Sequence, residues 1–232
     1  MLTRSAFQQI RMAPEVPRFI ATRSSVMQPD PMLLEAPSPS AGIQGNKAYR
    51  DDVRAHARKA GRDPNEIKVL FVVAPILGET DAEAQAKFER IRQHPMFVER
   101  TLASISSITD IDFAKFDLDE ELPRLTTNGE QGSLDAFAQW GSGKTLRQLV
   151  MEQVSRGLDG MVGTPDRVAD NMGMIMQEVG GDGFLITRPH TTFVSRQYIT
   201  DICEGLVPAL QRRGLVRTEY TKSTLQETLR EF

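Results

Sequence analysis

The stretch MVGTPDRVADNMGMIMQEVGGDGFLITRPH, residues 161–190, predicts a helix followed by a buried strand. Thr164 is a suitable N-cap, and Pro165 at the first helical position lacks an N–H that would have stayed unbonded there. Gly180 and Gly181 end the helix. Its apolar residues recur at helical spacing, which is typical of core packing: Val168, Met172, Ile175, Met176 and Val179. GFLIT, residues 183–187, then predicts a short strand.

The same order of strand and helix precedes this stretch. IKVLFVVAPILG, residues 67–78, contains consecutive apolar residues, which predict a strand over 67–76 that is covered on both faces, as in parallel sheets. Thr80 and Glu83 form a capping box that opens a helix ending at about Gln93.

A third strand and another helix precede residue 67. Residues 32–36 predict a strand. The polar stretch from residue 46 predicts a helix with Tyr49, Val53 and Ala57 on one face, and Gly61 is expected to end it. Repeated strand-helix order indicates an α/β fold with parallel strands. A closed (β/α)₈ barrel needs eight strands, so the three predicted here do not close one.

Residues 94–160 interrupt this rhythm and predict a helical insertion. The insertion has an acidic stretch that lacks the glycine and the ligand spacing of a calcium loop, so we expect a solvated edge (Asp110, Asp112, Asp117, Asp119, Glu120, Glu121).

FAQWGSGKTLRQLV, residues 137–150, resembles a phosphate-binding loop only in part. The first glycine of that motif is replaced by Ala138, and no buried strand precedes it. We therefore expect Thr145 to cap a helix, with Gln148 reaching back to it.

The composition excludes several classes of function. The 232 residues carry a net charge of -3, which gives no general attraction to nucleic acid or to an anionic membrane, and no apolar run is long enough to span a bilayer. The histidines are too far apart to form a metal site. The single cysteine, Cys203, has helical spacing from apolar neighbours and is expected to be buried.

The first 30 residues are rich in arginine and serine and predict an unstructured or targeting-like leader. A cytoplasmic location is expected, with a mitochondrial one as the alternative that this leader raises.

Several motifs, in order, resemble one family. MVGTPDRVADNM, GGDGFLI and LVPALQRRGLVRTEY are similar to the C-terminal part of the bacterial-luciferase-like flavin-dependent monooxygenases, in the branch of nitrilotriacetate and dibenzothiophene-sulfone monooxygenases. YRDDVRAHARKAGRDPNEIKVL, GETDAEAQAKFERI and DIDFAKFDLDEELP extend the resemblance upstream. It implies a TIM barrel that oxidises a small organic substrate with O₂ and reduced FMN, the latter supplied by a separate NADH-dependent flavin reductase. A homo-oligomer is a further expectation.

The resemblance also has departures. The family's first four strands and its sixth strand have no counterpart, so residues 31–232 are interpreted as the C-terminal part of a luciferase-like barrel. LLEAPSPSAGIQ resembles the segment where the family binds the FMN phosphate, but Pro37 and Pro39 each remove a backbone donor there. Ser38 and Ser40 are candidate replacements through their hydroxyls, and a proline-stiffened linker is the alternative.

The loop after the last strand supplies the other candidates. Arg188 could pair with a phosphate or an acidic substrate, and His190 could bond an oxygen atom on the flavin or shuttle a proton. Thr191 and Thr192 would also lie at the barrel mouth, and an ordinary solvent loop is the alternative. Two hypotheses about the whole chain result: an FMN-dependent monooxygenase, or a non-catalytic remnant that needs missing strands or a partner chain.

Overall fold

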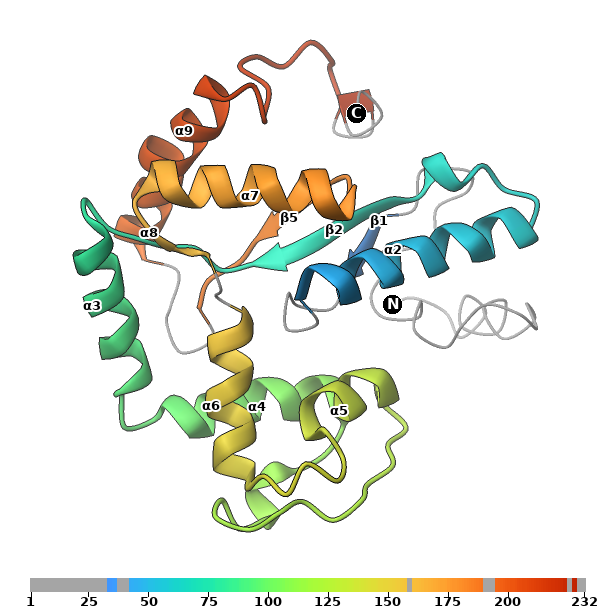
Figure 1. Cartoon of the computed structure of the whole chain (residues 1–232), viewed down its shortest axis with the longest axis vertical. Coiled ribbons are helices and arrows are strands. Elements are labelled where there is room, and N and C mark those ends of the chain that lie inside the picture. The colour runs from blue at the N-terminus through green and yellow to red at the C-terminus, as the bar shows by residue number, and fades with distance from the viewer. Residues whose placement is uncertain (1–32, 37–41, 158–159, 190–194, 225–226, 229–232) are drawn as a thin grey trace, which may run out of the picture.

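A computed structural model describes residues 33–36, 42–157, 160–189, 195–224 and 227–228. Its main sheet has three parallel strands in the order β1 (Leu33–Ala36), β2 (Lys68–Val73) and β5 (Gly183–Ile186), as Figure 1 shows. Leu34 pairs with Val69, and Val72 pairs with Leu185. The predicted strands near 32–36 and 183–187 and the parallel α/β class are therefore confirmed.

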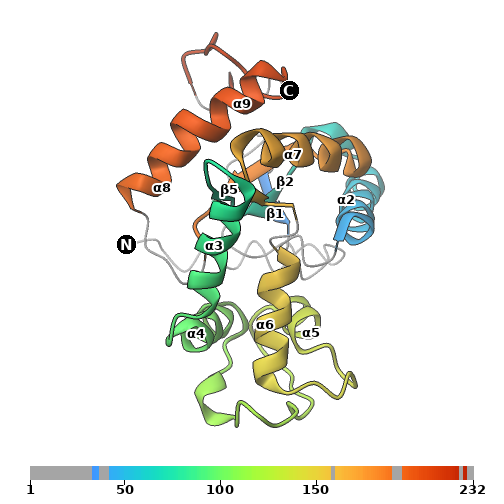
Figure 2. The same ribbon diagram turned by 60° about the vertical axis from the view of Figure 1, so that its left-hand side comes forward.

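Helices α2 (Gly42–Lys59) and α7 (Pro165–Val179) pack side by side on one face of this sheet (Figures 1 and 2). Val53 and Ala57 of α2 and Val179 of α7 form one cluster with Val69 and Phe71 of β2. Phe71 is 1% exposed, and burial of a side chain of this size contributes about 3 kcal/mol.

The predicted N-caps at Thr164 and Thr145 and the predicted stop at Gly180 are confirmed. The Thr164 side chain accepts a hydrogen bond from the Arg167 N–H, and Gly180 ends α7 with a left-handed φ of 66°. A side chain at that φ would strain the backbone, so glycine suits the position. The Thr145 hydroxyl accepts from the Gln148 N–H, and the Gln148 side chain accepts from the Thr145 N–H. GSGKT is thus a capped start of α6 (Leu146–Gly157).

Two boundaries differ from the prediction. The helix expected from residue 46 begins at Gly42. The strand expected over 67–76 divides at Ala74 and Pro75, and its second part, β3 (Ile76–Leu77), pairs in parallel with β4 (Val162–Gly163). Pro75 has no N–H for a ladder, which explains the break. The two-residue strand β4 was too short to be predicted.

Residues after α3 (Asp81–Arg92) form a separate helical group, which lies below the sheet in Figure 1. It contains α4 (Phe97–Thr109), the 3₁₀ turn η5 (Phe113–Lys115), α5 (Gln131–Ala138) and α6, around its own apolar cluster. In that cluster the rings of Phe113 and Phe137 lie edge to face, 5.4 Å apart. The acidic stretch over 110–121 has all six acidic side chains exposed, as expected.

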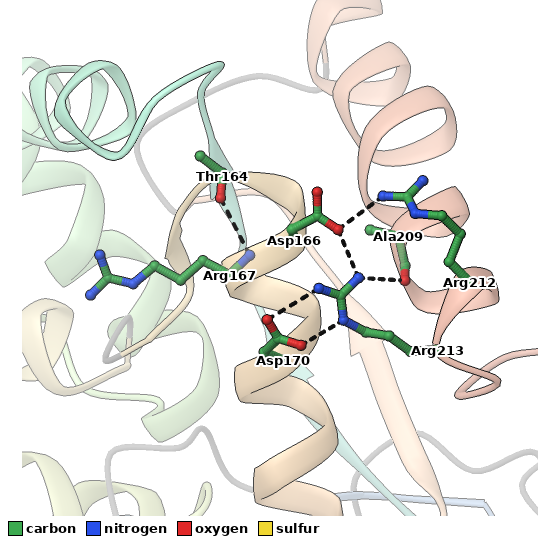
Figure 3. Close-up of polar contacts among 7 residues, drawn as sticks. All are labelled: Thr164, Asp166, Arg167, Asp170, Ala209, Arg212 and Arg213. Atoms are coloured by element: carbon green, nitrogen blue, oxygen red, sulfur yellow. Dashed lines mark hydrogen bonds and ion pairs between the residues drawn. The ribbon is translucent and has the colours of Figure 1, made fainter.

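The C-terminal helix is continuous through α8 (Arg196–Thr200), a π-helical segment η6 (Asp201–Leu206) and α9 (Val207–Arg212). Arg213 bonds Asp170 at 2.6 Å and Asp166 at 2.7 Å, and it also donates to the Ala209 carbonyl (Figure 3). These bonds join the end of α9 to α7 and lower the pKa of both carboxyl groups.

The prediction that Cys203 is buried is wrong, because its side chain is exposed. Ile202 and Leu206 lie four residues apart and pack against the core, whereas Ile199 and Cys203 lie on the adjacent face of the same helix. Ile199 is 51% exposed. The sequence pattern did not distinguish the two faces.

Candidate active-site cleft

A cleft of about 410 Å³ lies where the carboxyl ends of β2, β3 and β5 meet. Its floor contains Pro75, Ile76 and Leu77, which continue the chain from β2 into β3. Figure 1 shows this end of the sheet between α3 and α8. Ligands of open parallel sheets bind at the carboxyl ends of the strands, so this is the end at which chemistry is expected.

One wall of the cleft comes from a basic face at the C-terminal end of α3. Lys87, Arg90 and His94 line it together with the apolar Ile91. Lys87, Arg90 and Ile91 are three or four residues apart and share one face of α3, and His94 follows just after the helix ends.

Two of these basic side chains are held in place. Lys87 Nζ donates to the Leu77 carbonyl at 2.8 Å and pairs with Glu83 at 3.0 Å. His94 Nδ1 accepts from the Met96 N–H at 3.2 Å. A neutral imidazole in that bond carries its proton on Nε2, which is then a donor.

The base of α3 is fixed to the start of α7. Asp81 accepts hydrogen bonds from the Thr164 N–H at 3.1 Å and from Arg167 at 2.8 Å. These bonds lower the pKa of Asp81. They fix the strand ends of β3 and β4 relative to each other and thereby the direction in which α3 presents its basic face.

The opposite wall is formed by the start of the C-terminal helix, where Tyr198 is the largest side chain. The Tyr198 hydroxyl donates to the Thr187 carbonyl at 2.5 Å, and the Tyr198 N–H donates to Ser195 Oγ at 3.1 Å. Desolvation raises the pKa of Tyr198 to about 12. Nearby, Gln197 donates to Asp201 at 2.6 Å.

Tyr198 therefore holds both ends of the segment between β5 and α8. Thr187 extends the sheet, since its N–H bonds the Val73 carbonyl at 2.8 Å. Ser195 is the N-cap of α8. One tyrosine thus connects the last strand to the helix that follows it, at the edge of the cleft.

One of the candidate residues from the sequence lies within the described residues, and the others lie outside them. Arg188 is exposed, and it lies between Thr187 and the buried Pro189 of the cleft lining. His190, Thr191, Thr192, Ser38 and Ser40 lie outside the described residues, and their roles stay predictions.

Sequence reasoning missed the side chains that form the two walls, Arg90, His94 and Tyr198. The signal for the first wall was present in part, because Lys87 and Arg90 lie on one face of the helix that follows a predicted strand, and His94 lies just beyond its end. The second wall had no such signal.

At the opposite end of the sheet, Asp182 has a structural position. It accepts a hydrogen bond from the Val69 N–H at 2.8 Å and pairs with Arg54 at 3.4 Å. Its side chain is 12% exposed. This carboxylate joins α2, β2 and the turn before β5 at the amino ends of the strands, which in such folds serve stability.

The parallel sheet, the helices on one of its faces and the cleft at its carboxyl ends together define an α/β fold with a candidate ligand site. A family model described as luciferase-like monooxygenase matches residues 26–183. The chain belongs to this family.

Several curated relatives are named as monooxygenases. Nitrilotriacetate monooxygenase component A of Aminobacter aminovorans is 34% identical over 81% of this chain and 42% of its own length. Dimethyl-sulfide monooxygenase of Hyphomicrobium sulfonivorans is 31% identical over 82% of this chain and 39% of its own length. The chain thus spans about two fifths of the length of these relatives.

Solved structures agree with the fold. The long-chain alkane monooxygenase structure has a TM-score of 0.59 and 28% identity, and it covers 81% of this chain and 38% of its own. A riboflavin lyase structure with modified FMN and substrate riboflavin has a TM-score of 0.66 at 24% identity, over 85% of this chain and 42% of its own. At that identity the likeness concerns the fold alone.

The part of the chain that the structure describes contains no helix long and apolar enough to cross a membrane. Within the same residues, no group of three or more histidine, cysteine or acidic side chains is placed to hold a metal ion.

Proposed function

We propose that this chain carries part of the active site of an FMN-dependent monooxygenase. This part lies at the carboxyl ends of strands that belong to the C-terminal half of a luciferase-like (β/α)₈ barrel. The cleft at the ends of β2, β3 and β5 is the observation that carries the proposal. It lies at the end of the sheet where barrel enzymes place their chemistry, and the family of the chain is one of monooxygenases.

The lining of the cleft suits a flavin. Ile76, Leu77 and Tyr198 offer an apolar surface for a planar ring, and basic side chains from α3 lie beside that surface. Pockets for cofactors combine a mostly apolar lining with a few polar groups in this way. Reduced FMN would supply the electrons that activate O₂ for insertion into a small organic substrate.

The side chains of this chain would bind, orient and exclude water. The apolar floor limits water at the reacting end of the ligand. Tyr198 keeps Thr187 in place and so fixes the chain immediately before Arg188. An apolar floor with a fixed rim suits a reaction in which water must be kept away from the activated oxygen until the substrate has reacted.

A separate NADH-dependent flavin reductase is the proposed source of reduced FMN. The name of the Aminobacter relative, component A, supports a system of more than one protein. The proposal also includes a small organic substrate.

Titration of the purified full chain with FMN, followed by quenching of flavin fluorescence, tests the proposal. We expect saturable binding in the range of about 1–100 μM, with one flavin per chain. The absence of saturation in a sample with a cooperative thermal transition would favour the non-catalytic alternative. The Tyr220→Phe variant is a suitable control, because Tyr220 is 79% exposed and is not among the residues that line the cleft.

A further inference from the structure

We infer that the basic face of α3 is an oxyanion subsite, which binds the carboxylate or phosphate group of a small organic acid whose apolar part lies on the cleft floor. This inference rests on the proposed function, because it concerns the same cleft. The donors would be Arg90 and His94, beside the Lys87–Glu83 ion pair.

Charge and geometry carry the first step. Arg90, His94 and Lys87 line one wall, where Lys87 is paired with Glu83 at 3.0 Å, whereas the single acidic side chain in the lining, Asp201, lies on the other wall and accepts a bond from Gln197. An anion would therefore meet its donors, the Arg90 guanidinium and the His94 ring, on the α3 side of the cleft. Arginine and an imidazole N–H are donors that suit carboxylate and phosphate oxygens.

The second step is that this wall is organised before any ligand binds. Lys87 is bonded to the Leu77 carbonyl and His94 to the Met96 N–H, so neither is an unrestrained surface side chain. Asp81 fixes the first turn of the same helix against α7. A preorganised wall spends less side-chain entropy when a ligand binds.

The third step is the proximity of apolar surface. Ile76 and Leu77 are each 5% exposed and form the floor beside the basic wall. A free inorganic anion would make no use of that floor, whereas an organic acid would bury its apolar part there. The ligand class is therefore an acid with an apolar body.

The Arg90→Gln variant tests the inference, with Arg58→Gln as its matched control. Both arginines are exposed residues in the last turn of a helix, so both substitutions change the net charge and the helix end alike. Thermal unfolding of both variants shows first that they remain folded.

Two pairs of probes separate the sources of the oxyanion. FMN and riboflavin differ only in the phosphate. Phenylacetate carries a charged carboxylate where phenylacetamide carries a neutral amide. If the subsite holds the flavin phosphate, Arg90→Gln weakens FMN binding about tenfold and leaves riboflavin unchanged. If it holds the substrate acid, Arg90→Gln weakens phenylacetate binding about tenfold and leaves phenylacetamide and FMN unchanged.

The contrary result is equally clear. Equal affinities for Arg90→Gln and Arg58→Gln in both pairs of probes would overturn the oxyanion subsite. Failure of the proposed function is a separate outcome, because wild-type protein would then bind neither FMN nor riboflavin, while the phenylacetate pair would still report on the wall.

Discussion

Replacement of Tyr198 by phenylalanine removes one hydroxyl from the edge of the cleft and nothing else. That hydroxyl donates to the Thr187 carbonyl, so Tyr198→Phe costs one hydrogen bond, about 1 kcal/mol of the free energy of unfolding near neutral pH. The ring stays in the cleft lining, and no cavity of the size of a ring is created.

The alkaline range gives a sharper expectation. Desolvation raises the pKa of Tyr198 from 10.0 to about 12. Two pKa units correspond to about 3 kcal/mol, and because Tyr198 is only partly buried, solvent screening reduces this to about 1–2 kcal/mol. A raised pKa contributes stability that is fully present below about pH 10 and is lost as the pH rises toward about 12.

Urea unfolding followed by circular dichroism at about pH 8 and about pH 11 measures this difference. Wild type is expected to be more stable than Tyr198→Phe at the lower pH, and the gap is expected to close or reverse at the higher pH, because phenylalanine does not ionise. Tyr49, whose pKa burial also raises, is present in both proteins and cancels in the comparison. Tyr220→Phe should behave as wild type. An identical loss of stability with pH in wild type and Tyr198→Phe would refute the reasoning.

Three further outcomes are expected. Asp182→Ala should lower the free energy of unfolding by about 1–3 kcal/mol, measured by urea unfolding, because it leaves the Val69 N–H and Arg54 without their carboxylate; a change below about 0.5 kcal/mol would contradict the structural position. Neither wild type nor Lys144→Ala should bind ATP at GSGKT in equilibrium dialysis. Saturable ATP binding by wild type that is lost in Lys144→Ala would show instead that GSGKT is a phosphate-binding loop. Cys203 should react with a thiol reagent in the native protein as fast as in urea, and strong native protection would contradict its exposure.

Local rules explain how much of the fold could be predicted. Thr164 and Pro165 begin α7 and Gly180 ends it, through contacts within one turn of the chain. Thr80 and Thr145 begin their helices in the same way. The same holds for the long apolar run of β2. Such signals depend on near neighbours in the sequence, so they can be seen before the chain folds.

The exact ends of strands and the buried faces of helices were harder to predict from the sequence. The break at Pro75 depends on a second sheet, β3 with β4, whose two-residue strands carry no periodicity. The exposure of Cys203 depends on which face of its helix α7 covers. Neither the strand break nor the exposure of Cys203 is determined by residues that are close in the sequence.

The sequence by itself determined the order of strands and helices, their caps, the parallel character of the sheet and the family motifs, because each is set within a turn or a strand. Only the tertiary structure determined the cleft. Arg90 follows one strand and Tyr198 follows another, and they come to opposite walls because parallel strands bring their carboxyl ends to one edge of the sheet. The bond from Tyr198 to Thr187 arises in the same way, since a hydrogen bond between a helix and the end of a strand exists only after both have packed.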